Sequence, residues 1–431
     1  MRKITALLLA FVLFTSGCAQ TEEESADEVS LSFSWWGNET RDARTRQVLG
    51  LYEDAHPGVS FSCQSLEFSE YWKRLAADTA GRVLPDLMQM DYMYLRQYAE
   101  RGLLLDMTPY VEDGTLPLDG VNLDLLEAGS VDGKLYAVCN GVNAPALIYN
   151  QTLLEEAGIS LPESMTAAEF ETVCREVYQK TGIKTNYRYH QNIDAIEFAL
   201  RDAGLVLVDQ DGFRVDTADE LLPFFESMAR GIAEGWQIPP EVMADRTVSS
   251  VERNPLVYGE TAAERSWCVF VWSNMLSAFR QAAPEGVKLG ITCWPSEHPE
   301  RSNYLKPSQF FCISADCRNP TAAVDVIAAL TNSVEYNKVL LGERGRPASA
   351  AVAQAIEPEL DESARMASAF VRERIEPHCS PINPQPPAGV DALNQVLHLI
   401  EEDLCFGKIT AAQAAERFLQ EGTEVLEKAR G

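Results

Sequence analysis

Strand-like and helix-like patterns alternate between residues 31 and 101, and this alternation restricts the fold more than any other feature. Apolar side chains at every second position over 31–35 predict a strand, and 41–55 carries them at helical spacing. A Pro-Gly pair stops that helix, and strand-like alternation resumes over 59–63. Strands that alternate with helices predict an α/β fold built on a largely parallel sheet.

Two short signals extend this interpretation into the middle of the chain. Capping boxes at Thr166–Glu169 and Thr217–Glu220 predict the starts of two helices. Asp211 and Gly212, between apolar residues, predict the turn of a β-hairpin.

The N-terminus carries the pattern of an export signal. Arg2 and Lys3 precede an apolar run over 4–14, which is too short to span a bilayer by itself. Small residues then lead to Cys18 in "TSGC", which resembles a bacterial lipobox. We therefore expect removal of residues 1–17 as a signal peptide and lipidation of Cys18.

The lipobox pattern departs from its usual form at one position, which keeps an alternative open. Thr15 stands where Leu, Val or Ile is usual, so an unlipidated secretory signal cut near Ala19 is the other interpretation. The acidic stretch over 18–28 cannot bury apolar surface, so we expect a solvated tether between the membrane and the fold.

Length and charge limit the class further. The 431 residues exceed what one hydrophobic core of about 250–300 residues holds, so two domains are expected. The formal net charge of −28 repels phosphate, which argues against nucleic acid as a partner.

Cysteines and histidines give no metal-site pattern. None of the ten cysteines is spaced C-x-x-C and the five histidines are scattered, so we expect no metal and no cofactor. Most cysteines lie in apolar runs and read as buried free thiols. Cys312 and Cys317 form the most plausible disulfide if one exists.

Sequence motifs of enzymes are missing as well. The chain has no G-x-S-x-G, H-E-x-x-H, P-loop or G-x-G-x-x-G pattern, so we expect no enzymatic activity. A catalytic triad or a pair of carboxylates that only folding brings together stays open, because its members need not be neighbours in sequence.

Aromatic and polar residues follow several predicted strands. Ligands of open α/β sheets bind beyond the carboxyl ends of the strands. Indole faces suit the apolar face of a sugar ring, and Asp, Asn and Arg suit its hydroxyls. The strand-end candidates for a carbohydrate ligand are Trp36, Asn38, Asp91, Tyr92, Trp272, Asn274 and Trp294.

Each candidate also has a structural interpretation. Trp36 should be covered by ligand while Trp35 faces the core, because successive strand residues point to opposite faces. Asn38 could instead satisfy the turn after Gly37, and Asp91 could cap the next helix. Trp272 and Trp294 could equally be packing residues.

An ordered set of segments resembles a known family. These are "FSWWGNETR", "YEDAHPGV", "YWKRLAADTAG", "PDLMQMD", "YAERGLLLDMTPYV", "VDGKLYAV", "ALIYNQTLLEEAGI", "GETAAERSW", "LGITCWP" and "GERGRPAS". Together they resemble the extracellular solute-binding proteins of bacterial ABC importers, specifically the carbohydrate-binding lipoproteins, from about Val29 to Arg430.

The resemblance implies a two-lobed, periplasmic-binding-protein-like fold of type II, with a hinge and a ligand cleft between the lobes. One lobe would comprise 29–139 plus about 292–345, and the other 140–291 plus about 346–431. It also implies a lipid-anchored protein outside the cell membrane that binds sugar and delivers it to a permease. We expect a monomer.

Four further candidate ligand contacts come from loops or from the expected hinge. Arg346 lies in the "GERGRPAS" loop, and Arg41 follows the first strand, so an acidic sugar stays possible. Each arginine could instead form a surface salt bridge or begin a helix. The hinge has "AVCNG" where the family often has proline, which leaves Asn140 and Asn143 as open candidates.

Two other functions remain in competition. An exported carbohydrate-active hydrolase would share the aromatic cleft but add two carboxylates across the scissile bond. A solute-binding protein of the same fold could take a non-sugar ligand such as a peptide, a polyamine or a metal ion, although the lack of histidine clusters argues against a metal.

Overall fold

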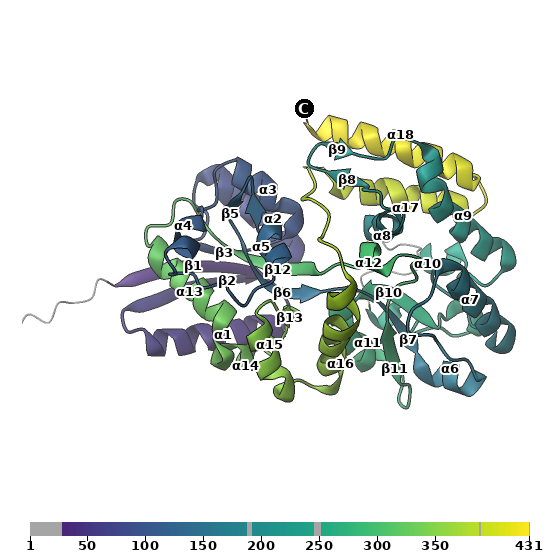
Figure 1. Cartoon of the computed structure of the whole chain (residues 1–431), viewed down its shortest axis with the longest axis horizontal. Coiled ribbons are helices and arrows are strands. Elements are labelled where there is room, and N and C mark those ends of the chain that lie inside the picture. Colours follow the sequence, from purple (N-terminus) through teal and green to yellow (C-terminus); the bar gives the residue numbers. More distant parts are fainter. Residues whose placement is uncertain (1–27, 188–191, 245–250, 388, 431) are drawn as a thin grey trace, which may run out of the picture.

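The chain forms two α/β lobes that lie side by side (Figure 1). The computed structural model describes residues 28–187, 192–244, 251–387 and 389–430. The expected signal peptide, Cys18 and nearly all of the tether fall outside these residues. Each lobe has its own sheet and its own hydrophobic core.

The first lobe is built on a six-stranded sheet in the order β13-β6-β12-β3-β1-β2. Its elements are β1 Val29–Trp36, α1 Glu39–Ala55, β2 Val59–Leu66, α2 Phe68–Gly81, β3 Leu87–Met90, α3 Tyr92–Glu100, α4 Thr108–Glu112, α5 Leu123–Ala128, β4 Ser130–Val131, β5 Lys134–Leu135, β6 Val138–Asn143, β12 Lys306–Ile313, α13 Pro320–Asn332, α14 Val334–Leu340, β13 Arg346–Pro347 and α15 Ala350–Ile356.

The prediction of a largely parallel sheet holds for half of this sheet. β1 pairs in parallel with β2 and with β3, as the βαβ pattern predicts. β12 pairs antiparallel with both β3 and β6, and β13 pairs antiparallel with β6. The reversal arises because β12 enters the sheet from the other lobe and so runs against its neighbours.

The second lobe is built on a three-stranded antiparallel sheet in the order β10-β7-β11. Its elements are β7 Pro145–Asn150, α6 Gln151–Ala157, α7 Ala167–Thr181, α8 Ile193–Asp202, β8 Val208–Asp209, β9 Gly212–Phe213, α9 Ala218–Glu234, α10 Pro240–Ala244, β10 Cys268–Trp272, α11 Leu276–Ala282, β11 Leu289–Thr292, α12 Pro299–Ser302, α16 Glu362–Phe370, α17 Asp391–Cys405 and α18 Ala411–Arg430.

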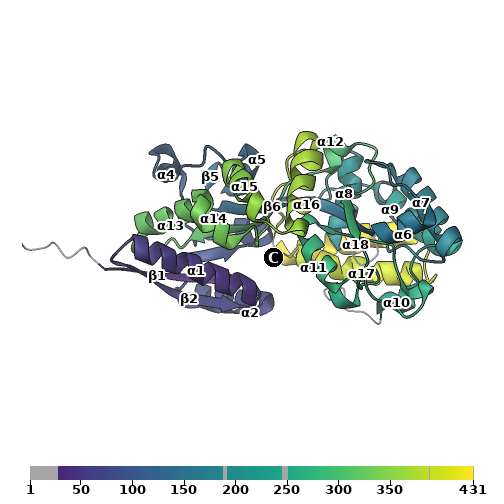
Figure 2. The same ribbon diagram turned by 90° about the horizontal axis from the view of Figure 1, so that it is seen from below.

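The chain passes between the two sheets at Ala144. β6 ends at Asn143 and β7 begins at Pro145, so a single residue links the sheets. The backbone N–H of Ala144 donates to Ser273 Oγ at 3.1 Å, and Ser273 N–H donates to Ala144 O at 2.9 Å. α16 lies at the junction of the lobes in both views (Figures 1 and 2).

This topology shifts all three predicted lobe boundaries. α12, expected in the first lobe, packs on α8 of the second, and α15, expected in the second lobe, packs beside β13 of the first. Residues 140–143 were expected in the second lobe, but they extend β6 and pair with β12 and β13 of the first sheet. Arg346 and Pro347 form β13 of the same sheet. Backbone pairing, which the sequence pattern does not reveal, carries these residues into the first lobe.

The local signals are confirmed. Both capping boxes are present at Thr166 and Thr217, and β8 and β9 form the expected hairpin around Asp211. Cys312 and Cys317, like the other cysteines of the described residues, are free. Within the described ranges, no helix has the length and apolar character needed to cross a membrane.

Candidate ligand-binding site

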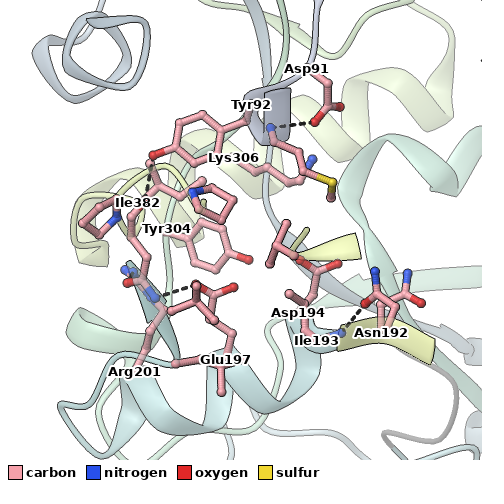
Figure 3. Close-up of a pocket in the computed structure, with 18 of the residues that line it drawn as sticks. Asp91, Tyr92, Asn192, Ile193, Asp194, Glu197, Arg201, Tyr304, Lys306 and Ile382 are labelled. Atoms are coloured by element: carbon pink, nitrogen blue, oxygen red, sulfur yellow. Dashed lines mark hydrogen bonds between the residues drawn. The ribbon is translucent and has the colours of Figure 1, made fainter. Parts of the chain in front are cut away.

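A pocket with about 960 Å³ of empty space, part of it open to solvent, lies between the lobes. The first lobe contributes the start of α3 and the start of β12. The second lobe contributes α8, the end of β10 and the start of α17 (Figure 3). The segment 382–386, which precedes α17, completes the wall.

Aromatic rings from both lobes line this pocket. Trp272 ends β10, and its ring lies 6.2 Å from that of Tyr304 between centroids. Tyr92 comes from the first lobe and stacks on Phe310 of β12 with centroids 6.2 Å apart. Lys306 Nζ lies 4.9 Å from the Trp272 ring, close enough for a cation–π contact.

Two acidic residues of α8 also line the pocket. Asp194 and Glu197 are three residues apart, so they share one helix face. Burial raises the pKa of Asp194 to about 6, and burial together with the charge of Asp194 raises the pKa of Glu197 to about 7. Both carboxylates are therefore held in an environment that disfavours their charged form.

One turn further along α8, Arg201 fixes the wall of the pocket. Its guanidinium donates to the side chain of Asn383, to Ser380 Oγ at 2.5 Å and to Pro381 O at 2.8 Å. Asn383 Nδ2 in turn donates to Glu197 Oε1 at 2.5 Å. Arg201 thus holds the segment 380–383 against α8.

Asp91 serves two purposes at once. It is the N-cap of α3, and its Oδ1 accepts from the N–H of Met93 at 3.0 Å. The same residue lines the pocket. The capping and ligand-contact interpretations of Asp91 are therefore compatible.

A second pocket lies against the same strands that join the lobes. Lys306 lines the first pocket, while its β-sheet partner Asn143 lines the second. Trp272 lines the first pocket, and the next residue, Ser273, lines the second. The second pocket brings together five of the predicted site residues, namely Asn38, Arg41, Asn143, Asn274 and Arg346.

The second pocket suits a sugar less well than the first. None of the described residues that line it is aromatic. Two of its three arginines already have carboxylate partners: Arg41 Nε lies 2.6 Å from Glu343 Oε2, and Arg346 lies 2.7 Å from Glu376 Oε1. The third, Arg44, donates to Leu340 O at 3.0 Å. Asn38 is the N-cap of α1 and accepts from Arg41 N–H at 2.9 Å, which confirms its structural interpretation.

Trp36 is buried by other side chains of its own lobe, so the expectation that a ligand covers it was wrong. The indole is 7% exposed and lies among the aromatic side chains of α2, with ring centroids at 5.5 Å from Phe68, 5.1 Å from Tyr71 and 5.7 Å from Trp72. Trp35 points to the other face of β1, as expected, where the Arg46 guanidinium of α1 covers it. The helix that follows the next strand covers Trp36, so no ligand is needed there.

Trp294 is also a packing residue. It is 5% exposed and lies 5.0 Å from Phe198 and 5.3 Å from Phe270 between ring centroids, inside the core of the second lobe. Of the ten predicted site residues, Asp91, Tyr92 and Trp272 meet in the first pocket. Neither pocket includes Trp36 or Trp294.

Sequence reasoning missed several residues of the first pocket. Asp194, Glu197 and Arg201 stand at i, i+3 and i+7 in "IDAIEFALRD", which places them on one face of a helix. That polar stripe on an otherwise apolar helix was an available signal. Tyr304, Lys306 and Asn383 carry no comparable signal, because tertiary packing brings them to the pocket.

Groups of three or more His, Cys, Asp or Glu side chains placed to hold a metal ion are missing from the described part of the chain. The three carboxylates of the first pocket face two cations, Arg201 and Lys306. The site is therefore equipped for hydrogen bonding and ring stacking.

Two α/β lobes joined by crossing strands, with a pocket at their junction, define the class of two-lobed solute-binding proteins. The chain belongs to the family of bacterial extracellular solute-binding proteins, whose family model matches residues 50–367. The fold and family expected from the ordered segments are thus confirmed.

Individual relatives agree with this assignment. A putative binding protein of Brucella abortus is 24% identical over 223 residues, which are 49% of this chain and 51% of that protein. The chain thus matches about half the length of this curated relative. An extracellular solute-binding protein of family 1 from Alicyclobacillus acidocaldarius is 25% identical, with a TM-score of 0.78 over 94% of this chain and 100% of that chain.

Two further solved structures share the fold at lower identity. A periplasmic oligogalacturonide-binding protein of Yersinia enterocolitica is 20% identical, with a TM-score of 0.75 over 94% of this chain and 100% of that one. The GacH receptor of Streptomyces glaucescens, solved unliganded and with acarbose, is 18% identical, with a TM-score of 0.70 over 93% and 99% of the two chains.

Proposed function

We propose that this protein is the lipid-anchored, extracytoplasmic binding component of an ABC importer, and that it captures a sugar or oligosaccharide in the first pocket. The observation that carries the proposal is the meeting of Trp272 and Tyr304 with Tyr92 across the two lobes, beside several carboxylates. Indole and phenol faces stack on the C–H face of a sugar, and carboxylates accept from its hydroxyls. Relatives of the same fold that bind oligogalacturonide or acarbose add support.

Binding would act by closing the lobes, as in other periplasmic binding proteins. A ligand that touches α3 and α8 together makes all of its contacts in one arrangement of the lobes, so it favours that arrangement. Ala144, the single residue between β6 and β7, is the natural pivot. The closed, loaded protein would then deliver its sugar to the membrane permease as a monomer, held near the membrane by lipid on Cys18.

The test is a thermal-shift and calorimetry screen of mono- and oligosaccharides on the protein from Thr21 onward. A binding sugar raises the melting temperature because it stabilises the native state. Trp272→Ala should abolish the shift, while Phe406→Ala, which removes an exposed ring outside both pockets, should preserve it.

Chromatography of the incubated sugars separates the receptor from a hydrolase. Recovery of every sugar unchanged supports a receptor. Catalytic turnover would show that the protein is a hydrolase instead. A peptide or polyamine that binds where all sugars fail would overturn the choice of ligand. Labelling with radioactive palmitate in a bacterial host, with Cys18→Ala as the control, tests the lipid anchor.

A further inference from the structure

We infer that the first pocket prefers a sugar that carries a basic amine and rejects uronic acids. The inference rests on the proposed sugar-binding function and adds the charge of the ligand. It follows from counting which hydrogen-bonding groups of the pocket are already used and which remain open.

Most hydrogen-bond donors of Arg201, the strongest donor in the pocket, are already occupied. Arg201 directs its guanidinium at Asn383, Ser380 and Pro381, and it contacts the Tyr304 ring at 4.7 Å from the centroid. The Tyr92 hydroxyl donates to Asn383 O at 2.7 Å. With the bond from Nε to Ser302 O, four of the five N–H groups of Arg201 are occupied, so these two side chains offer a ligand carboxylate one free N–H.

The acceptors remain open in contrast. Within the described residues, Asp194 accepts no hydrogen bond, although its carboxylate faces the cavity (Figure 3). Glu197 accepts one, from Asn383 Nδ2, and Asp91 accepts one, from Met93 N–H. A carboxylate can accept about four hydrogen bonds, so most of the acceptor capacity awaits a donor.

The balance of charge points the same way. Lys306 is the remaining cation, and it lies over the Trp272 ring with no carboxylate oxygen of the described residues within ion-pair distance. Arg201 keeps its charge, because its hydrogen-bond partners are neutral, so three carboxylates outnumber two cations. An ammonium group supplies three donors and a positive charge, which match this surplus of acceptors and of negative charge.

The arginines that suggested an acidic sugar lie elsewhere. Arg41 and Arg346 line the second pocket, where Glu343 and Glu376 neutralise them. The first pocket thus lacks the paired arginine forks that recognise carboxylates. An oligogalacturonide would bring acceptors and negative charge to a site that already has a surplus of both.

Sugars that differ at one substituent give the sharpest test. The probes are methyl glycosides of glucose, galactose and mannose, each in the 6-hydroxy, 6-amino and 6-carboxylate forms. They are titrated by calorimetry at about pH 8, above the raised pKa values of Asp194 and Glu197, so that both side chains are ionised. For the ring that binds, we expect the amine to bind about 10-fold more tightly than the hydroxyl form, as a charge-assisted hydrogen bond permits. The carboxylate form should bind weakest.

Two variants test whether the acidic face of α8, formed by Asp194 and Glu197, causes the preference for the amine. Asp194→Asn and Glu197→Gln should each lower the affinity for the amine form more than the affinity for the hydroxyl form, so that most of the amine's advantage is lost. Glu226→Gln, an exposed acidic residue of α9 outside the pocket, is the matched control and should change neither. Melting curves confirm that each variant is folded.

The outcomes separate the two proposals. If the carboxylate form binds most tightly, or if the amine has no advantage in the unmutated protein, the inference is overturned and sugar binding stands. If an amine advantage persists in both acidic-face variants, the assignment to Asp194 and Glu197 is overturned. If no sugar binds, here or in the wider oligosaccharide screen, the proposed function itself fails.

Discussion

The hydroxyl of Tyr92 donates a hydrogen bond of 2.7 Å to the backbone carbonyl of Asn383 and so joins the two lobes beside the pocket. Tyr92 begins α3 of the first lobe, and Asn383 lies in the segment that Arg201 holds against the second. Burial raises the pKa of Tyr92 well above its usual range, so the hydroxyl stays protonated and able to donate. The contact links the position of the lobes to the wall of the pocket.

Removing this hydroxyl should weaken the junction. Tyr92→Phe leaves the ring on Phe310 but leaves the Asn383 carbonyl without its donor, so the free energy of unfolding should fall by about 1 kcal/mol. Urea denaturation measures the loss. Tyr110→Phe is the control, because the Tyr110 hydroxyl has no hydrogen-bond partner among the described residues. Equal effects of both substitutions would mean that the interlobe bond contributes nothing.

Substitution of Trp36 and of Trp272 by alanine should have different effects on stability and on ligand binding. Trp36→Ala empties an aromatic cluster in the core of the first lobe and should reduce the free energy of unfolding by about 3–5 kcal/mol. Its folded fraction should still bind ligand, since Trp36 lines neither pocket. Trp272→Ala should lose ligand with a smaller loss of stability. Calorimetry with denaturation separates the effects, and the reverse pattern would refute this assignment.

Glu197 should make stability depend on pH. Its pKa is raised to about 7 in the folded protein, chiefly by burial and then by Asp194, against 4.5 in the unfolded chain. Between these values the folded protein holds a proton that the unfolded chain has released, so stability falls as pH rises. Arg201 opposes this shift, and Lys306 lowers the pKa of neighbouring Asp194.

Glu197→Gln keeps an acceptor for Asn383 but cannot ionise. Between about pH 5 and pH 8, the free energy of unfolding of the variant should fall by about 1–2 kcal/mol less than that of the parent. The full shift of the Glu197 pKa would give a larger difference, but solvent that enters the pocket screens it. Denaturation at a series of pH values measures the difference. Glu226→Gln should show the same pH dependence of stability as the parent. If Glu197→Gln also showed that dependence, the raised pKa of Glu197 would be contradicted.

Gly345 should tolerate no side chain. Its φ is +100°, and an added Cβ would lie 2.7 Å from Asn143 Oδ1 and 2.8 Å from Val142 O, at the end of β6. Gly345→Ala should therefore destabilise the protein through both backbone strain and collision. Gly114 has a φ of +82° with nothing within 4 Å, so Gly114→Ala reports the strain alone. Gly345→Ala should lower the free energy of unfolding by about 1–3 kcal/mol more than Gly114→Ala, as measured by thermal denaturation. Equal losses for the two variants would exclude the collision.

Local pattern was enough for the elements and the class of fold. The period-two run over 31–35, the capping boxes at Thr166 and Thr217, and the turn at Asp211 each formed the element that they predict. Each of these signals depends on residues only a few positions apart, so it can be recognised in the sequence alone. The ordered segments were enough for the family, because their order and spacing follow the whole fold.

The tertiary structure decided which side chains meet. Trp36 points away from Trp35, as strand geometry requires, but only the docking of α2 determines that Phe68, Tyr71 and Trp72 cover it. Asp91 and Glu197 are far apart in sequence and line one pocket, while the adjacent Trp272 and Ser273 line two. A site between lobes depends on how separate elements pack, and that packing is set by contacts across the whole chain rather than by the pattern of any one segment.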